Sequence, residues 1–208
     1  MNNYEKSRNQ ARPCFLTFNQ EQIIRKFGLK YDEAYLYIRF CSRPYRISRT
    51  TGVVEWSEDG FVTCTEGDYN ESMTLYDILC YSRADCCLSG EFAPSSSLPG
   101  LAYTGMNAGS SMGLKKTEAF FDAHVELLKR SCIALGGIPE GKGDVAYRIP
   151  MFDFLPVRFS FWQADEDFSA EIRVLWDTHV LQFMHFETLF FAAGHLLRRM
   201  EEWIENHS

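Results

Sequence analysis

The sequence has no long uninterrupted apolar segment, which argues against a protein that is inserted into a membrane. The longest apolar candidate, residues 189–197, is broken by Gly194 and His195, and no segment approaches the roughly 18 apolar residues of a membrane-spanning helix. The first ten residues, MNNYEKSRNQ, also lack the apolar stretch that a secretory signal requires. We therefore expect a soluble cytoplasmic protein with no membrane partner.

An excess of positive charge is also missing. The chain has 21 Lys and Arg residues against 28 Asp and Glu residues, which gives a formal net charge of -7. Proteins that bind nucleic acid usually present a basic surface, because their affinity depends on displacing the counterions of the phosphates. Nucleic acid is therefore excluded as the expected main partner.

Short motifs that would identify an enzyme or a cofactor are absent from the sequence. There is no CxxC, HExxH, GxGxxG or GxxxxGK[ST] pattern, and the GxSxG letters at 109–113 fall in a segment rich in Gly and Ser rather than at the strand-to-helix turn of a nucleophile elbow, so no catalytic residue and no cofactor can be named from a motif. The cysteine count of seven is odd, and the local cluster of Cys80, Cys86 and Cys87 lacks the spacing of a metal finger or an iron–sulfur site. Free thiols are expected, and they fit a reducing compartment.

Aromatic residues, by contrast, are abundant. With 208 residues, 46% of them hydrophobic and 24% charged, the chain has the composition of a folded globular protein, and we expect a single domain over residues 1–208. Seventeen Phe, 10 Tyr and 4 Trp make up 15% of the chain. This is enough to build a core and to leave rings for a ligand pocket or an interface.

Cap residues and apolar spacing predict four main helices. Asn19 is expected to cap a short amphipathic helix over residues 19–27 that stops at Gly28. Thr74 is expected to cap the next helix, with Asp77 early in it, where a negative charge suits the helix dipole. The remaining two helices are predicted over residues 114–135 and 187–205.

Alternating apolar residues predict two antiparallel meanders of three strands. The first covers residues 35–64, and the second has strands around residues 145–149, 157–161 and 172–176. Between the meanders, residues 90–113 are rich in Gly, Ser and Pro and are expected to form a long ordered loop. The predicted fold class is α+β with a mainly antiparallel sheet, and a duplicated helix–meander unit is an open alternative.

The richest polar segment, residues 162–188, carries two sets of candidate site residues. Carboxylates and imidazoles two apart in an extended segment project to one side and could hold a divalent metal. The candidate metal ligands are Asp177, His179, His185 and Glu187. The candidate ligand-binding residues combine the acidic turn with the surplus rings near it: Phe92, Tyr103, Trp162, Asp165, Glu166, Phe168 and Trp176.

Several of these residues also carry a resemblance to a known family. The run of Trp162, Asp165, Glu166 and Phe168, the triplet at 175–177, Glu187 opening the last helix and the LPG at 98–100 are the most specific features. With them, most of the chain resembles an uncharacterised bacterial family, catalogued only as a domain of unknown function and found largely in anaerobes. Some members carry an iron–sulfur module like that of corrinoid iron–sulfur proteins, which this chain lacks.

The resemblance implies an anaerobic setting and a link to corrinoid or one-carbon metabolism, but it implies no catalytic residue. The leading hypothesis is a non-catalytic ligand-binding or accessory domain for a small molecule or a partner protein. Its pocket is expected between the loop at 90–113 and the segment at 162–187. The alternatives are a metal-dependent hydrolase that uses the four candidate metal ligands, and a structural homodimer.

Overall fold

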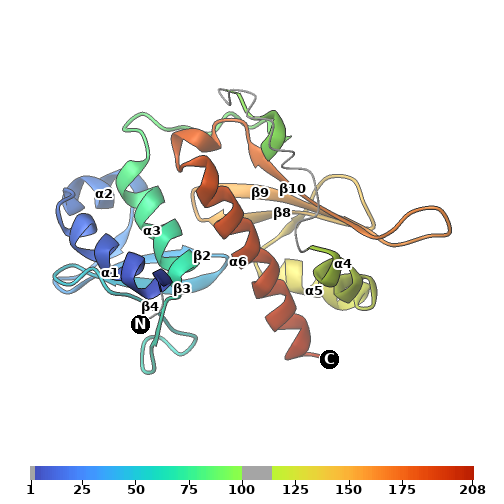
Figure 1. Ribbon diagram of the computed structural model, residues 1–208, viewed down its shortest axis with the longest axis horizontal. Helices are drawn as coiled ribbons and strands as arrows, with labels where there is room; N and C mark the ends of the chain where they lie inside the picture. The colour runs from blue at the N-terminus through green and yellow to red at the C-terminus, as the bar shows by residue number, and fades with distance from the viewer. Residues whose placement is uncertain (1–2, 100–113) are drawn as a thin grey trace. The chain divides into compact units, whose positions relative to one another are not determined.

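The computed structural model describes residues 3–99 and 114–208, and these form two compact units (Figure 1). Both units are discontinuous in sequence. Within the described residues, unit 1 comprises 3–86, 152–154 and 181–192, and unit 2 comprises 87–99, 114–151, 155–180 and 193–208.

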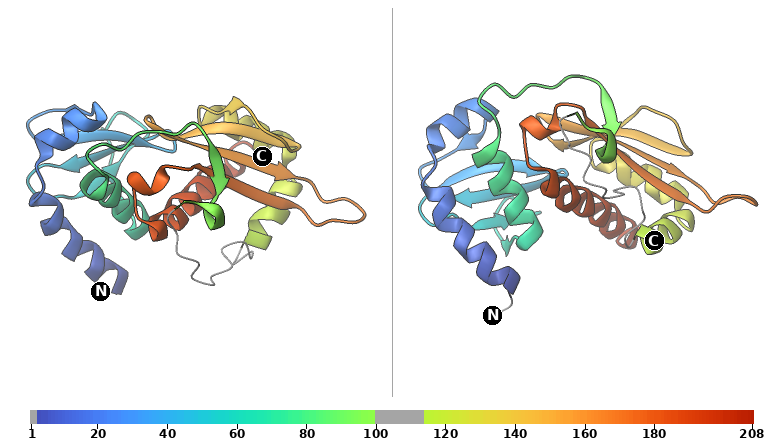
Figure 2. Two further views of the ribbon diagram at one scale, coloured as in Figure 1. Left: turned by 90° about the horizontal axis from the view of Figure 1, so that it is seen from above. Right: turned by 45° about the horizontal axis from the view of Figure 1, so that its top comes forward.

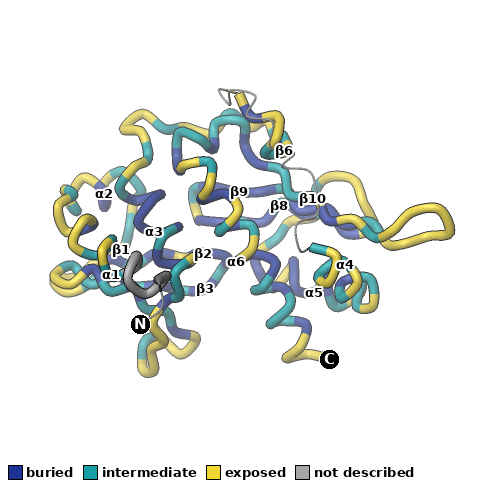
Figure 3. The backbone as a smooth tube through the Cα atoms, in the orientation of Figure 1, coloured by how far each residue is buried: buried dark blue, intermediate teal, exposed yellow. Residues whose placement is uncertain are grey.

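The strands of unit 1 form an antiparallel sheet in the order β5-β4-β3-β2-β1. The strands are β1 (Lys30–Tyr31), β2 (Tyr35–Phe40), β3 (Arg43–Ser48), β4 (Val54–Trp56) and β5 (Thr65–Glu66). Leu36, Ile38 and Phe40 of β2 are buried while the residues between them are more exposed, as the period of two requires (Figure 3). The first predicted meander is therefore confirmed.

Three helices accompany this sheet: α1 (Asn3–Leu16), α2 (Gln20–Phe27) and α3 (Tyr69–Tyr81). The views in Figure 2 show α1 and α3 running side by side. Helix α2 begins as predicted, because the Asn19 side chain accepts a hydrogen bond from the backbone N–H of Gln22. It ends at Gly28, whose φ of 61° is a left-handed conformation that glycine adopts without strain.

Helix α3 begins earlier than predicted. Its N-cap is Asp68, which accepts from the Glu71 backbone N–H at 2.9 Å, while the Glu71 carboxylate accepts from the Asp68 backbone N–H at 2.7 Å. This reciprocal capping box fixes the start of the helix. Thr74 lies inside the helix, where its hydroxyl donates to the Asn70 carbonyl at 2.7 Å, so its predicted role as the cap is wrong.

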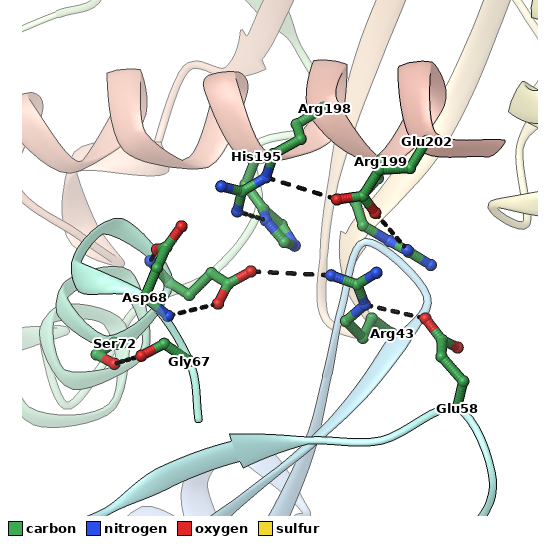
Figure 4. A network of polar contacts seen from close by, with 10 residues as sticks. Arg43, Glu58, Gly67, Asp68, Ser72, His195, Arg198, Arg199 and Glu202 are labelled. Carbon is green, nitrogen blue, oxygen red and sulfur yellow. Dashed lines mark hydrogen bonds and ion pairs between the residues drawn. The ribbon is translucent and has the colours of Figure 1, made fainter. Parts of the chain in front are cut away.

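A buried arginine ties this capping box to the sheet of unit 1 (Figure 4). Arg43 of β3 donates to Glu58 at 3.0 Å and forms an ion pair with the capping residue Glu71 at 3.9 Å. Its guanidinium also lies 3.9 Å from the ring centroid of Trp56. Because Arg43 is only 6% exposed, both carboxylates are needed to compensate for burying its charge.

Stacked phenylalanines complete the core of unit 1. The Phe152 ring lies 4.8 Å from that of Phe40 with an interplanar angle of 7°, and Phe154 stacks on Phe27 at 4.3 Å. Phe152 is the last residue of one strand and residues 153–154 form the turn to the next, while the remaining residues of both strands belong to unit 2. The core of unit 1 therefore includes two phenylalanine rings from a segment that lies far downstream in the sequence.

The strands of unit 2 are also antiparallel, in the order β7-β8-β9-β10-β6. They are β6 (Phe92–Pro94), β7 (Ile138–Pro139), β8 (Val145–Phe152), β9 (Leu155–Trp162) and β10 (Glu171–Asp177). The long β9–β10 hairpin extends beyond the rest of these strands (Figure 2). This meander confirms the second predicted one, and with it the α+β fold class.

The helices of unit 2 differ in one respect from the prediction. Instead of one helix over 114–135, the chain forms α4 (Leu114–Asp122) and α5 (Val125–Ala134). At the break, His124 adopts φ -134° and ψ 36°, and its Nδ1 lies 2.8 Å from the Phe120 carbonyl oxygen. The last helix, α6 (Phe186–Glu205), matches the predicted one, and its first residues up to 192 belong to unit 1.

Two arginines of α6 share one glutamate in unit 2 (Figure 4). Arg198 and Arg199 approach Glu202 at 3.9 and 2.9 Å, and a nitrogen of Arg198 lies 3.0 Å from Nδ1 of the buried His195. Both ion pairs join residues three or four positions apart, which are neighbours on the surface of a helix.

The expected loop over residues 90–113 is described only as far as residue 99. Within that part the chain forms strand β6 and a short 3-10 turn, η1 (Ser95–Ser97), so these ten residues are not structureless. Residues 100–113 lie outside the described residues. The single domain over 1–208 and the duplicated unit stay predictions. No helix in the described part of the chain is long and apolar enough to cross a membrane.

Candidate functional site

An apolar cavity lies within unit 1, against α1, α3 and the start of α6. Its volume of about 360 Å³ is at the lower end of the range typical of small-molecule sites. Phenylalanine and tyrosine rings, thiols and a few polar side chains form the walls. The lining residues are Ala11, Cys14, Phe15, Phe18, Met73, Tyr76, Asp77, Cys80, Tyr81, His185, Glu187, Thr188 and Phe191.

A buried carboxylate organises the polar part of this cavity. Asp77 on α3 is 8% exposed, and its Oδ2 accepts from the His185 backbone N–H at 2.8 Å and from the Thr188 hydroxyl at 2.6 Å. Its Oδ1 lies 2.5 Å from Nδ1 of the His185 ring. These contacts join α3 to His185 and Thr188, which follow Asp77 in the sequence by 108 and 111 positions. Asp77 therefore holds both the backbone and the imidazole of His185.

This arrangement fixes the tautomer of His185. An ionised carboxylate can only accept hydrogen bonds, so the ring nitrogen that faces Asp77 must carry a proton. In the neutral imidazole the lone pair is then on Nε2. The side chain of His185 is 62% exposed, whereas that of Asp77 is 10% exposed, so the ring spans from the buried acid to the open side of the site. Nε2 is available to accept a proton, to accept a hydrogen bond or to bind a metal.

Aromatic rings and thiols surround the histidine. The Tyr81 ring packs edge-on against the His185 ring with centroids 5.5 Å apart, and the Tyr81 hydroxyl lies 3.4 Å from the sulfur of Cys14. Burial raises the pKa of the Cys80 thiol to about 12. Cys80 is therefore protonated at neutral pH and is a poor nucleophile.

The two remaining predicted metal ligands belong to unit 2, and Asp177 has a structural role there. Its carboxylate is 1% exposed and accepts from the backbone N–H groups of Ser89, Gly90 and His179 and from the Ser89 hydroxyl, at 2.8 to 3.1 Å. Although burial alone would raise the pKa of Asp177, these donors lower it below its usual value. Two oxygens that already accept these four donors have little capacity left for a metal.

The four predicted metal ligands are divided between the two units. The ring of His179 contacts Cys87, with Nδ1 at 3.2 Å from the carbonyl oxygen, while His185 and Glu187 line the cavity of unit 1. Across residues 3–99 and 114–208 there is no group of three or more His, Cys, Asp or Glu side chains that could hold a metal ion.

Three of the predicted aromatic ligand-binding residues, Phe92, Trp162 and Trp176, lie on strands of unit 2. The Arg158 guanidinium lies 4.3 Å from the Phe92 ring, and Arg173 lies 4.9 Å from the Trp162 ring. Trp176 on β10 is 2% exposed, which makes it a core residue. These rings therefore already have protein partners.

The acidic turn that joins β9 to β10 is a solvent-exposed loop. Asp165 accepts from the backbone N–H groups of Asp167 and Phe168 at 2.9 and 2.8 Å, which is how an aspartate stabilises a turn. Glu166 is exposed, and the Phe168 side chain is 73% exposed. Tyr103 lies outside the described residues, so the pocket expected between 90–113 and 162–187 stays a prediction.

Sequence reasoning assigned Asp77 to the first turn of a helix and missed its role in the cavity. Because α3 begins at Tyr69, Asp77 lies in its third turn, and among the residues whose burial is described it is one of the few charged residues that are buried. An acidic residue within the apolar run of Leu75, Ile78 and Leu79 was the available signal. Its partner could not be read from the sequence, because His185 is 108 residues away.

Comparison with known proteins places the chain in a family without assigning it an activity. No curated protein and no solved structure matched it. The model of one family, described as "Domain of unknown function (DUF3786)", matches residues 19–199, which include most of both units. The chain therefore belongs to the DUF3786 family.

Proposed function

We propose that this protein is a ligand-binding accessory domain without catalytic activity of its own, and that its ligand occupies the cavity of unit 1. One observation carries the proposal: an aromatic cavity of about 360 Å³ contains a histidine held by a buried carboxylate. Small-molecule sites combine mostly apolar walls with a few placed polar groups in this way.

The walls favour a ligand with a flat apolar surface. Phe15 and Tyr76 have ring centroids 5.6 Å apart, and Phe18 meets Tyr81 edge-on at 5.3 Å. Such rings offer both faces and edges to an aromatic ligand. Among the polar groups of the cavity are the fixed imidazole of His185 and the Glu187 carboxylate, which can orient a ligand through hydrogen bonds.

The biological setting that we propose follows from the family resemblance. We infer a cytoplasmic protein of an anaerobic bacterium that serves corrinoid or one-carbon metabolism. All seven cysteines lie within the described ranges, and none of them is in a disulfide. An exposed thiol such as that of Cys64 supports a reducing compartment.

Equilibrium binding tests the proposal. The purified protein is titrated with a panel of corrinoids, flavins and other flat cofactors, and at least one is expected to bind well below about 1 mM. Ala11→Trp fills the cavity and should weaken that binding at least tenfold. Ala164→Trp adds the same side chain to the exposed β9–β10 connection and should leave binding unchanged.

Two results would contradict the proposal. If no panel member binds below the millimolar range, the cavity is not a site for this class of ligand. If Ala164→Trp abolishes binding and Ala11→Trp does not, the ligand lies on unit 2, near the acidic turn.

A further inference from the structure

We propose, on the basis of the proposed function, that the ligand of this cavity is a small aromatic amine that binds as a cation. Its protonated amino group donates a hydrogen bond to Nε2 of His185, and the Glu187 carboxylate compensates its charge. Its ring lies among the phenylalanine and tyrosine rings of the walls. Three properties of the lining residues support this class of ligand: their hydrogen-bonding capacity, their charge and their ring faces.

The polar groups of the cavity that lack partners are hydrogen-bond acceptors. Because the Asp77 carboxylate accepts the proton of Nδ1 of His185, the neutral ring presents a lone pair on Nε2. Within residues 3–99 and 114–208, no hydrogen bond or ion pair joins the Glu187 carboxylate to another residue. A ligand that supplies N–H donors therefore satisfies two groups that the described part of the protein leaves open.

The hydroxyl groups that line the cavity are already used by the protein. Thr188 donates to the buried aspartate at 2.6 Å, and the Tyr76 hydroxyl donates to the Gly52 carbonyl at 2.6 Å. The Tyr81 hydroxyl lies 3.4 Å from the sulfur of Cys14. A ligand that carries only acceptors, such as a carboxylate, would find few donors among these walls and would face two acceptors.

The charge of the lining side chains also favours a cation. The carboxylates of Asp77 and Glu187 are negative, and no lysine or arginine belongs to the described residues that line the cavity. The start of α6 contributes the positive end of a helix dipole, which is equivalent to only about half a charge. The walls therefore keep a net negative charge, which attracts a cation and repels an anion.

Aromatic rings supply a second means of binding a cation. The faces of phenylalanine and tyrosine rings are negative, so they attract an ammonium group that lies within about 6 Å. The same rings pack against the ring of an aromatic ligand. The rings that line the cavity are those of Phe15, Phe18, Tyr76, Tyr81 and Phe191. These walls therefore hold both parts of an aromatic amine.

The cavity has the size of such a molecule. Its volume of about 360 Å³ corresponds to roughly a dozen water molecules at about 30 Å³ each. One or two fused aromatic rings with a short amine side chain have a comparable number of non-hydrogen atoms. Because the side chain of His185 is 62% exposed, the amino group can meet Nε2 at the open side of the site. A complete ligand of this class therefore fits inside the cavity.

Isothermal titration calorimetry of the full chain at pH 8 tests the proposal with three indoles of closely similar size. Tryptamine carries an ammonium group at this pH, because an alkylamine stays protonated well above neutrality. Tryptophol has a neutral hydroxyl in place of that group, and indole-3-acetate has a carboxylate. Tryptamine is expected to bind with a Kd below about 1 mM, tryptophol at least about tenfold more weakly, and indole-3-acetate more weakly still.

Two substitutions assign the contacts of the amino group. Glu187→Gln keeps the shape of the side chain and removes its charge, so it should weaken tryptamine binding about 3- to 10-fold and barely change tryptophol binding. His185→Phe keeps a ring against Tyr81 but removes Nε2, and it should weaken tryptamine binding about tenfold. Glu33→Gln removes an exposed carboxylate elsewhere in unit 1 and is the matched control, which should leave all three affinities unchanged.

A measurement on the wild type does not depend on how the variants fold. NMR of the imidazole nitrogens follows Nε2 of His185 directly, and its resonance should shift when tryptamine is added. The Nδ1 resonance, which reports the contact with Asp77, should shift less. An Nε2 resonance that stays in place at saturating tryptamine would show that the amine does not contact this nitrogen, and the proposal would be overturned.

The outcomes distinguish a wrong ligand class from a wrong function. If tryptophol or indole-3-acetate binds as tightly as tryptamine, the cavity does not select a cation, and the amine proposal fails while the proposed function stands. If Glu187→Gln and His185→Phe both bind tryptamine as the wild type does, the amine lies elsewhere and the amine proposal also fails. The proposed function survives alone if no indole binds but a flavin or another flat cofactor does and Ala11→Trp weakens its binding. If nothing in either panel binds, both fail.

Discussion

Removing the Asp177 carboxylate should destabilise unit 2 by about 3 kcal/mol. In Asp177→Ala three backbone N–H groups, those of Ser89, Gly90 and His179, lose their acceptor. A buried donor left without a partner costs about 1–3 kcal/mol. Because Gly90 is exposed and Ser89 and His179 are half-buried, water can replace part of the loss, so we take about 1 kcal/mol for each.

Urea unfolding at neutral pH, followed by tryptophan fluorescence, measures this loss. Three of the four tryptophans, Trp162, Trp176 and Trp203, belong to unit 2, so the signal mainly reports that unit. Asp167→Ala, an exposed aspartate in the same unit, is the matched control and should change the free energy of unfolding by less than about 0.5 kcal/mol. A loss below about 1 kcal/mol for Asp177→Ala would refute the assignment of this carboxylate as a structural acceptor.

The pH dependence of the stability tests the role of Asp177 independently. The pKa of Asp177 is lowered in the folded state below its usual value of 3.8, so its stabilising contribution is complete above pH 3.8 and is lost as the pH falls through the folded-state pKa. The difference in stability between the wild type and Asp177→Asn should therefore be constant near neutral pH and shrink below pH 3.8. A difference that grows on acidification would contradict this.

Three further predictions concern stability and thiol reactivity. Gly137→Ala places a Cβ 2.6 Å from a backbone oxygen at the end of α5 and should lower the free energy of unfolding by about 1–3 kcal/mol. Gly194→Ala on α6 adds a Cβ that meets no atom within 4 Å and should raise it by about 0.5–1 kcal/mol. Thermal unfolding compares the two variants, and equal effects would count against both predictions. Asp68→Ala removes the cap of α3 and should cost about 1 kcal/mol in a urea titration, and no loss would mean that the capping box is dispensable. Alkylation with iodoacetamide at pH 8 should modify the exposed Cys64 long before Cys80, whose pKa is raised to about 12, and peptide mass mapping would expose the opposite order.

Much of the fold could be predicted because its signals are local. Period-two alternation in β2, β3, β8, β9 and β10, and the cap at Asn19, depend only on neighbouring residues. The start of α3 was missed although Asp68 and Glu71 carry the spacing of a capping box, because Thr74 was the more conspicuous cap residue. The break between α4 and α5 has no Gly or Pro to announce it, and it depends on the backbone of His124.

The candidate site was predicted only in part, because its partners are distant in sequence. His185 and Glu187 line the cavity of unit 1, whereas Asp177 and His179, with which they were grouped as candidate metal ligands, belong to unit 2. The acid that His185 contacts is Asp77, which comes from a different helix. Periodicity reports which residues face a core, and it contains no information about which distant helix lines the same cavity.

The discontinuity of unit 1 has a consequence for how the protein is made. Asp77 leaves the ribosome 108 residues before His185, and synthesis at roughly 5–20 residues per second separates them by about 5–20 s. During that interval the acid lacks its three donors, and until residue 152 has been added the stack on Phe40 also lacks Phe152. The nascent cavity stays unfinished until the chain has been synthesised to about residue 191, so a ligand that contacts all of its walls can bind only after that point.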